Sequence, residues 1–95
     1  MSRLRVLVES ELYTSKLGEI DEIERLDEAI RGCLLVIAMH AEAFPVVAGK
    51  RLRLAKTKMV YLDKLIPGLK VWFIIRDEDT VDLQYIEQDL DPFAI

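Results

Sequence analysis

A chain of 95 residues, 52% hydrophobic and 32% charged, has the composition of a globular domain and room for one hydrophobic core. Its formal net charge of −4 argues against a general polyanion binder, because the overall field repels nucleic acid at long range. We therefore expect a single domain spanning residues 1–95.

The sequence predicts no membrane span, no metal site and no cofactor. The longest apolar run, residues 33–39, is far shorter than the roughly 20 residues that cross a bilayer. The N-terminal segment becomes charged before the apolar core of a signal peptide can form, so we expect a cytoplasmic protein. Cys33 is the only cysteine and sits in an apolar pattern that predicts burial, and the four glycines are too far apart for a phosphate-binding loop.

The N-terminal residues alternate in the manner of a β-strand. In residues 3–8, Leu4, Val6 and Val8 alternate with arginines, which is typical of a strand whose apolar face is covered. Residues 9–18 have a mixed pattern that fits either a short helix or a loop ending at Gly18.

From residue 21 onward the apolar residues repeat with the period of an α-helix. We expect this helix to end near Phe44, because Pro45 disfavours the helical conformation of the residue before it. Asp27 and Arg31 are spaced to form an ion pair on its surface. Residues 34–39 are apolar almost all the way round, which predicts burial on two sides, either within the domain alone or also against a partner protein.

A second alternating strand follows a connection at residues 46–49. Leu52 and Leu54 form its predicted covered face, opposite two arginines. Lys56 and Lys58 continue the same every-second-residue spacing and would fall on the face of the leucines. We therefore expect them to lie beyond the covered part of the strand or after a bulge.

The rest of the chain predicts a turn region and two further strands. Residues 59–68 form the turn region, closed by Pro-Gly, and residues 69–75 have the composition of a central strand. A polar connection at residues 77–80 leads to a last strand that alternates through residues 81–85. Strand, one or two helices and three strands together predict an α+β domain with an antiparallel sheet and helices on one face.

Basic residues are concentrated in residues 50–76. This stretch holds eight basic residues and one acidic residue, a local charge of +7 in an otherwise acidic chain. It predicts either a local anion-binding face or a solvated pair of strands whose charges cluster without function.

The element order and three sequence segments resemble the RelE/ParE superfamily of type II toxin–antitoxin toxins. The segments are LRLAKTK at residues 52–58, PGLKVWFIIR at residues 67–76 and TVDLQYIE at residues 80–87. The resemblance covers residues 21–87. It implies an N-terminal strand and a helical hairpin packed on an antiparallel sheet of about four strands.

In the RelE branch, the resemblance implies a toxin that cuts messenger RNA in the ribosomal A site. Such cleavage needs proton transfer and stabilisation of extra charge on the phosphate, for which a planar guanidinium is well suited. The resemblance then assigns charge stabilisation to Arg53 and Arg76 and proton transfer to Tyr85, although packing also explains this tyrosine. The expected RNA-binding residues are Arg51, Lys56, Lys58 and Tyr61.

In the ParE branch, the resemblance implies a gyrase inhibitor that binds protein and performs no bond chemistry. The acidic C-terminal tail and the lack of a convincing general base favour this alternative. An inactive relative of the same fold is a third alternative. In either toxin branch the expected partner is a cognate antitoxin, lying as an extended or helical segment over the sheet and the basic strand. The apolar helix also allows a homodimer.

Overall fold

The computed structural model describes residues 4–20, 26–58, 60–62, 64–66 and 68–89. It contains the elements β1 (Val6–Glu9), α1 (Glu11–Ile20), α2 (Leu26–His40), the 3₁₀ helix η1 (Ala41–Ala43), β2 (Val46–Ala48), β3 (Leu52–Lys56), β4 (Val60–Leu62), β5 (Lys64–Ile66), β6 (Gly68–Ile75) and β7 (Thr80–Asp89). In the part of the chain described, neither helix has the length and apolarity needed to span a bilayer.

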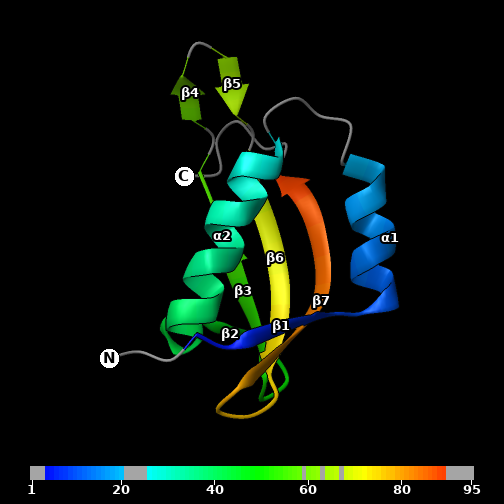
Figure 1. Ribbon diagram of the computed structural model, residues 1–95, viewed down its shortest axis with the longest axis vertical. Coiled ribbons are helices and arrows are strands. Elements are labelled where there is room, and N and C mark those ends of the chain that lie inside the picture. The colour runs from blue at the N-terminus through cyan, green and yellow to red at the C-terminus, as the bar shows by residue number, and fades with distance from the viewer. Residues whose placement is uncertain (1–3, 21–25, 59, 63, 67, 90–95) are drawn as a thin grey trace.

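The main sheet has five strands in the order β1-β7-β6-β3-β2 and is mixed (Figure 1). Strands β3, β6 and β7 are antiparallel neighbours, but β1 pairs with β7 in parallel, with Val6 beside Thr80. The expectation of an antiparallel sheet of about four strands is therefore wrong in both respects. Alternation identifies a strand but not its neighbour, and here β1 is paired with the last strand, a parallel connection that spans most of the chain.

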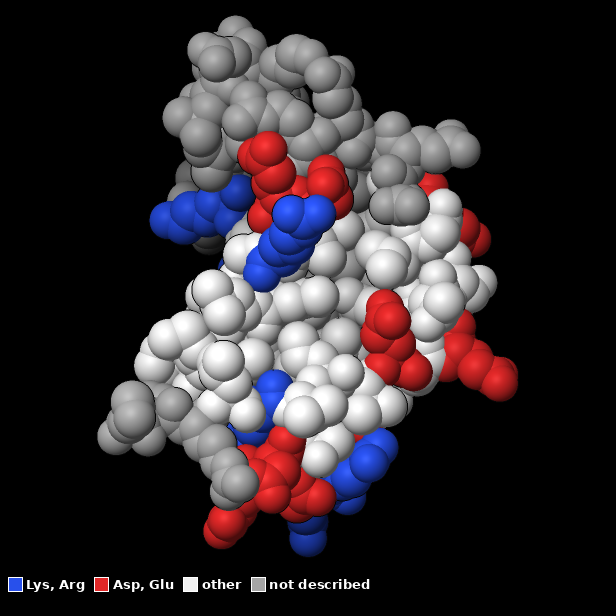
Figure 2. Space-filling view, in the orientation of Figure 1, with Lys and Arg blue, Asp and Glu red and all other residues white. Residues whose placement is uncertain are grey.

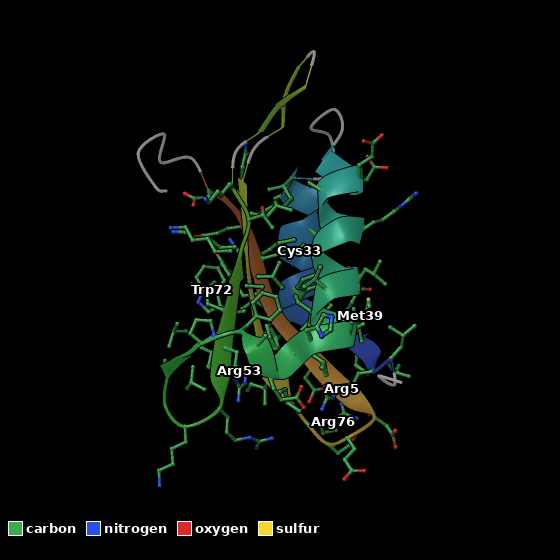
Figure 3. The ribbon with its side chains drawn as sticks, turned by 90° about the vertical axis from the view of Figure 1, so that its left-hand side faces the viewer. Arg5, Cys33, Met39, Arg53, Trp72 and Arg76 are labelled. Atoms are coloured by element: carbon green, nitrogen blue, oxygen red, sulfur yellow. The ribbon has the colours of Figure 1, made fainter. Side chains whose placement is uncertain are left out.

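The predicted α+β class is confirmed, and both helices cover the same face of the sheet (Figures 1 and 3). The core lies between this face and the helices. Tyr13 from α1 and Ile37 from α2 are fully buried in it, together with Leu69, Val71 and Phe73 of β6. The apolar side chains at alternate positions of β6 therefore form one side of the core.

Residues 9–18, whose sequence leaves helix and loop open, contain most of α1, and the helix continues past Gly18 to Ile20. Ser10 caps it. The Ser10 Oγ accepts a hydrogen bond from the Tyr13 backbone N–H at 3.1 Å and donates one to the Gln84 carbonyl oxygen at 3.0 Å. This side chain therefore fixes both the start of the helix and its attachment to β7.

The predicted long helix corresponds to α2 followed by η1, which ends just before Phe44 as expected. The predicted ion pair between Arg31 and Asp27 is present, at 3.9 Å. The expected first turn of the helix, residues 21–25, lies outside the described residues.

Two stretches expected to lack strands contain short ones. Residues 46–49, expected to be a connection, include β2. The predicted turn region at residues 59–68 contains β4 and β5, which pair with each other as a separate two-stranded sheet. Strands of three residues are too short to show a clear alternation, so the period-2 pattern gave no signal for them.

In β1 the predicted orientation is reversed. Leu4, Val6 and Val8, expected to face the core, are exposed, whereas Leu7 packs against the core and the Arg5 side chain is only 13% exposed. The alternation indicates a strand correctly. It carries no information on which face the rest of the chain covers.

The same reversal occurs in β3. Ala55 is fully buried on the helix-covered face, whereas Leu52 and Leu54 lie on the opposite face and are only half-buried. Lys56 pairs with Lys70 within the same regular strand, so no bulge is needed to explain its parity.

Candidate functional site

The sheet face turned away from the helices, which we call the open face, is lined by side chains from three strands. Residues directly opposite each other on neighbouring strands have their side chains on the same face of the sheet, so the pairing of β3, β6 and β7 identifies the members of the open face. The open face consists of Leu52, Leu54, Lys56, Lys70, Trp72, Ile74, Asp82, Tyr85 and Glu87.

An aromatic pair lies at the centre of the open face. The rings of Trp72 and Tyr85 are 5.2 Å apart, edge to face, and Figure 3 shows Trp72 on the side of the sheet opposite the helices. The register between β6 and β7 shifts at this point, with Trp72 opposite Tyr85 and Phe73 opposite Leu83. The extra residue, Gln84, is accommodated as a β-bulge, which brings Tyr85 beside Trp72.

Lys16 reaches the same aromatic pair from α1. Its Nζ lies 5.6 Å from the centre of the Tyr85 ring, within the range of a cation–π contact. The pKa of Lys16 is raised, mainly by its hydrogen bond and ion pair with Glu19 and further by Tyr85. The Tyr85 ring therefore lies beside a positive charge.

Arg53, a predicted catalytic residue, is not on the open face. It belongs to the helix-covered side of β3, where its Nη1 donates hydrogen bonds to the carbonyl oxygens of Phe44, at 2.6 Å, and Glu42, at 3.3 Å. These carbonyls belong to η1 and the residue that follows it. The guanidinium therefore holds the connection between α2 and β2 against the sheet.

Arg76, the second predicted catalytic arginine, is paired with Asp82. Its Nε donates to Asp82 Oδ2 at 3.0 Å, and its Nη2 bonds the other carboxylate oxygen. This bidentate pair joins the two strands beside the β6–β7 turn. Arg53 lies in β3 and Arg76 follows the neighbouring strand β6, but the two side chains are engaged in separate sets of contacts.

Of the predicted RNA-binding residues, Arg51 and Lys56 lie at opposite ends of β3. Arg51 donates to the carbonyl oxygen of Ile75 at 3.2 Å, and Lys56 lies 3.7 Å from the carboxylate of Asp89. Lys58 is exposed beyond the end of β3. The backbone of Tyr61 is part of β4, and its side chain lies outside what the structure describes.

Arg5 is a residue that the sequence analysis did not single out. It bonds both carboxylate oxygens of Glu42, at 3.1 Å from Nη1, and its Nε donates to the Asp77 carbonyl oxygen at 3.4 Å. This contact, with lesser contributions from the Glu42 backbone and Arg53, lowers the pKa of Glu42. The alternation of arginines with apolar residues in residues 3–8 indicated a polar side of the strand, but nothing in the sequence indicated that Glu42 would be the partner of Arg5.

A cavity of about 250 Å³ lies between α2 and β3. Its walls are mainly apolar and include Cys33, Val36, Phe44 and Ala55. Burial raises the pKa of the Cys33 thiol to about 11, so the wall presents a neutral thiol at physiological pH. Among the described residues, no cluster of His, Cys, Asp or Glu is arranged to hold a metal ion.

No protein family, curated protein or solved structure matches this chain.

Proposed function

We propose that this chain is a toxin of the RelE/ParE type that acts by binding a protein, as in the ParE branch, with the open face as its contact surface. The observation that carries the proposal is the half-buried Trp72–Tyr85 pair on a sheet face that neither helix covers. The order of strand, two helices and antiparallel meander β3-β6-β7, with additional short strands, also agrees with the resemblance.

The chemistry of the open face suits a protein partner. Tryptophan and tyrosine contribute strongly to protein interfaces because they bury a large area and lose little side-chain entropy. Leu54 pairs with Trp72, and Ile74 extends the apolar row along β6. Such a central apolar row surrounded by charged residues has the arrangement of an interface core and rim.

The charges favour this function over RNA cleavage. Lys70 is opposite Glu87 in register, and Lys56 is close to Asp89, so carboxylates offset the lysines of the open face. Arg53 and Arg76, expected to stabilise a phosphate, already bind carbonyl oxygens and a carboxylate. A phosphate would have to displace these partners before either guanidinium stabilised it.

The test is induced expression in a bacterial host. Growth, the integrity of a translated reporter message and a DNA-damage reporter are followed together. We expect growth arrest with an intact message, and we expect Trp72→Ala to relieve it. The control is Val47→Ala, which truncates an exposed apolar side chain on β2 and should leave the arrest unchanged.

Two results would contradict the proposal. Absence of any growth arrest would remove the toxin assignment. Arrest that persists in a folded Trp72→Ala variant would remove the open face from its mechanism, and circular dichroism of the purified variant establishes that it is folded.

A ribosome-dependent messenger-RNA endonuclease is the second candidate, and the contact between Lys16 and Tyr85 favours it. An aromatic ring beside a lysine can stack an RNA base and bind its phosphate, and Tyr85 also carries the hydroxyl that the resemblance assigns to proton transfer. Tyr85→Phe separates the candidates, because it removes the hydroxyl and keeps the ring. New 5′ ends inside the reading frame that disappear in Tyr85→Phe would establish cleavage, whereas the binding function should survive this substitution.

The proposed partners follow from the two candidates. A binding toxin of the ParE branch would target gyrase, and an endonuclease would act on messenger RNA in the ribosome. In both cases we propose a cognate antitoxin that covers the sheet. Purification after coexpression with the adjacent reading frame tests this, since a stable complex should form and restore growth.

A further inference from the structure

A second apolar surface lies on the opposite side of the molecule, around α2 and β1. Six large apolar side chains on it are between 37% and 64% exposed. We call this surface the β1–α2 patch, and it consists of Leu4, Val6, Val8, Leu12, Leu35 and Met39. Figure 2 shows uncharged side chains across the middle of this view, with charged ones toward its ends and one margin.

The two halves of the patch are joined by the backbone. The Arg5 N–H donates to the Ala38 carbonyl oxygen at 3.1 Å, so the start of β1 lies against the last turn of α2. Leu35 and Met39 are four residues apart and share one line of that helix, and Figure 3 shows Met39 on its side away from the sheet. Leu4 is the residue before Arg5, and Leu12 is in the first turn of α1, the element that directly follows β1.

Among the described residues, no strand pairs with the outer edge of β1, and α2 contacts this edge at its start, through the Arg5 N–H. The backbone N–H groups of Val6 and Ser10 donate to the carbonyl oxygens of Asp79 and Leu83. The backbone polar groups of the even-numbered residues therefore point toward β7. The backbone groups of Leu7 therefore point toward the free edge. Strand β1 carries no lysine or proline, the residues that commonly keep an edge strand from pairing with another chain.

The reversed parity of β1 supports a covering partner. Its sequence has the alternation of a strand with a buried apolar face, yet this chain leaves that face exposed. An exposed apolar patch of roughly 500 Å² is in the size range of the largest patch on a typical monomer, and a patch of that size often has a function.

We propose that the β1–α2 patch is the contact surface of a homodimer, in which two copies meet across a two-fold axis. The six side chains expose roughly 500 Å² in one copy, so two copies would bury about the 1,000 Å² that a specific interface requires. An uncharged surface lets two copies with the same net charge approach without a like-charge contact at the centre. A two-fold axis would also pair β1 with the partner's β1 in antiparallel orientation.

This dimer is separate from the proposed target contact, because it does not use Trp72 or Tyr85. Val8 is opposite Asp82 in register, so the strand part of the patch borders the open face without including its aromatic centre. The experiment is sedimentation equilibrium of the purified chain over a wide concentration range. We expect a monomer–dimer equilibrium, and we expect Met39→Glu and Val6→Lys each to raise the dissociation constant about tenfold or more, because each places an unpaired charge in the contact. Val47→Glu, at an apolar position on β2 whose exposure lies between those of Met39 and Val6, is the matched control and should leave the constant unchanged.

Three results would overturn the proposal. The first is a monomer at every concentration. The second is a dimer that Met39→Glu and Val6→Lys leave intact. The third is a dimer that Val47→Glu weakens as much as the patch variants do. The substituted side chains are exposed in the single copy, so circular dichroism should show that all three variants are folded.

Discussion

Arg53 donates a hydrogen bond to the carbonyl oxygen of Phe44 at 2.6 Å and thereby fastens the end of the helical region to the sheet. Phe44 in turn packs its ring edge to face against Phe73 of the central strand, with 5.7 Å between ring centres. A charged side chain on the covered face of β3 and an aromatic contact thus hold the same point of the connection. This makes Arg53 a residue of the fold, whatever further part it plays.

We predict that Arg53→Ala lowers the free energy of unfolding by about 1 to 3 kcal/mol, because the partly buried Phe44 carbonyl loses a charged donor. Arg51→Ala is the control, since Arg51 is exposed and donates one bond of 3.2 Å to Ile75. Urea denaturation measures both. Equal losses in the two variants would show that the contact to Phe44 contributes little.

The same result bears on function. If Arg53→Ala relieves growth arrest, the variant's stability decides between loss of a catalytic group and loss of the fold. Arg53→Lys keeps the charge and can still reach a carbonyl oxygen, but it lacks the planar fork that pairs two phosphate oxygens. Toxicity that survives in Arg53→Lys would therefore favour the structural role.

The elements with a strong period were predictable from sequence, and their environment was not. The 3.6-residue period identified α2, and the apolar composition of β6 identified a central strand. In β1 and β3 the alternation correctly predicted a strand, but the apolar side chains expected in the core point away from it. A period reports that two faces differ, and only tertiary packing decides which of them the same chain covers.

The candidate site was predictable only in part, for a related reason. The aromatic pair depends on the bulge at Gln84, and no residue type signals a bulge there. The role of Arg53 depends on where the carbonyls of Glu42 and Phe44 fall after the helix ends. Charge counts along the sequence revealed a basic stretch but not the carboxylate of Asp89, which comes from the last strand.

We predict that the Glu42 carboxyl titrates below the ordinary range of glutamate, about 4.3, because it accepts hydrogen bonds from Arg5. NMR titration of the side-chain carboxyl measures this pKa. In Arg5→Gln the neutral side chain can still donate, but the charge is gone, so the pKa should rise toward the ordinary value. A Glu42 pKa that is the same in both proteins would contradict the contact.

The sign of the corresponding stability effect follows from this shift. A carboxyl whose pKa is lower in the folded state stabilises the fold above its unfolded pKa, and this contribution is lost as the pH falls through the folded pKa. We therefore expect Glu42→Gln to lose less stability than the wild type as the pH is lowered through this window. Urea midpoints measured across it would reveal the difference.

We predict that Tyr13→Phe is neutral or stabilises the protein by up to about 1 kcal/mol, because it removes a buried polar group without a bond. Tyr13 is fully buried, and its hydroxyl has no hydrogen-bond partner among the described residues. Burial also raises the pKa of this phenol well above its usual value. Thermal unfolding compares the two proteins, and a clear loss of stability in Tyr13→Phe would indicate a partner for the hydroxyl.

Tyr13→Ala provides the contrasting case for this position. It removes the whole ring from the core and should cost about 3 to 5 kcal/mol, as is typical for deletion of a buried aromatic side chain. The pair of substitutions separates the ring, which packs, from the hydroxyl, which does not contribute.

We predict that the Cys33 thiol reacts slowly with iodoacetamide at neutral pH, because the reactive thiolate is scarce when burial raises the pKa to about 11. The thiol is 6% exposed, yet it lines the cavity between α2 and β3, so a small reagent has a route to it. The rate should therefore rise steadily with pH through the alkaline range while the protein stays folded, and Cys33→Ala should abolish the reaction. A rate at neutral pH equal to that of the urea-unfolded chain would show that the thiol is neither buried nor raised in pKa. A rate that follows the urea-unfolding transition alone would show that the cavity does not admit the reagent.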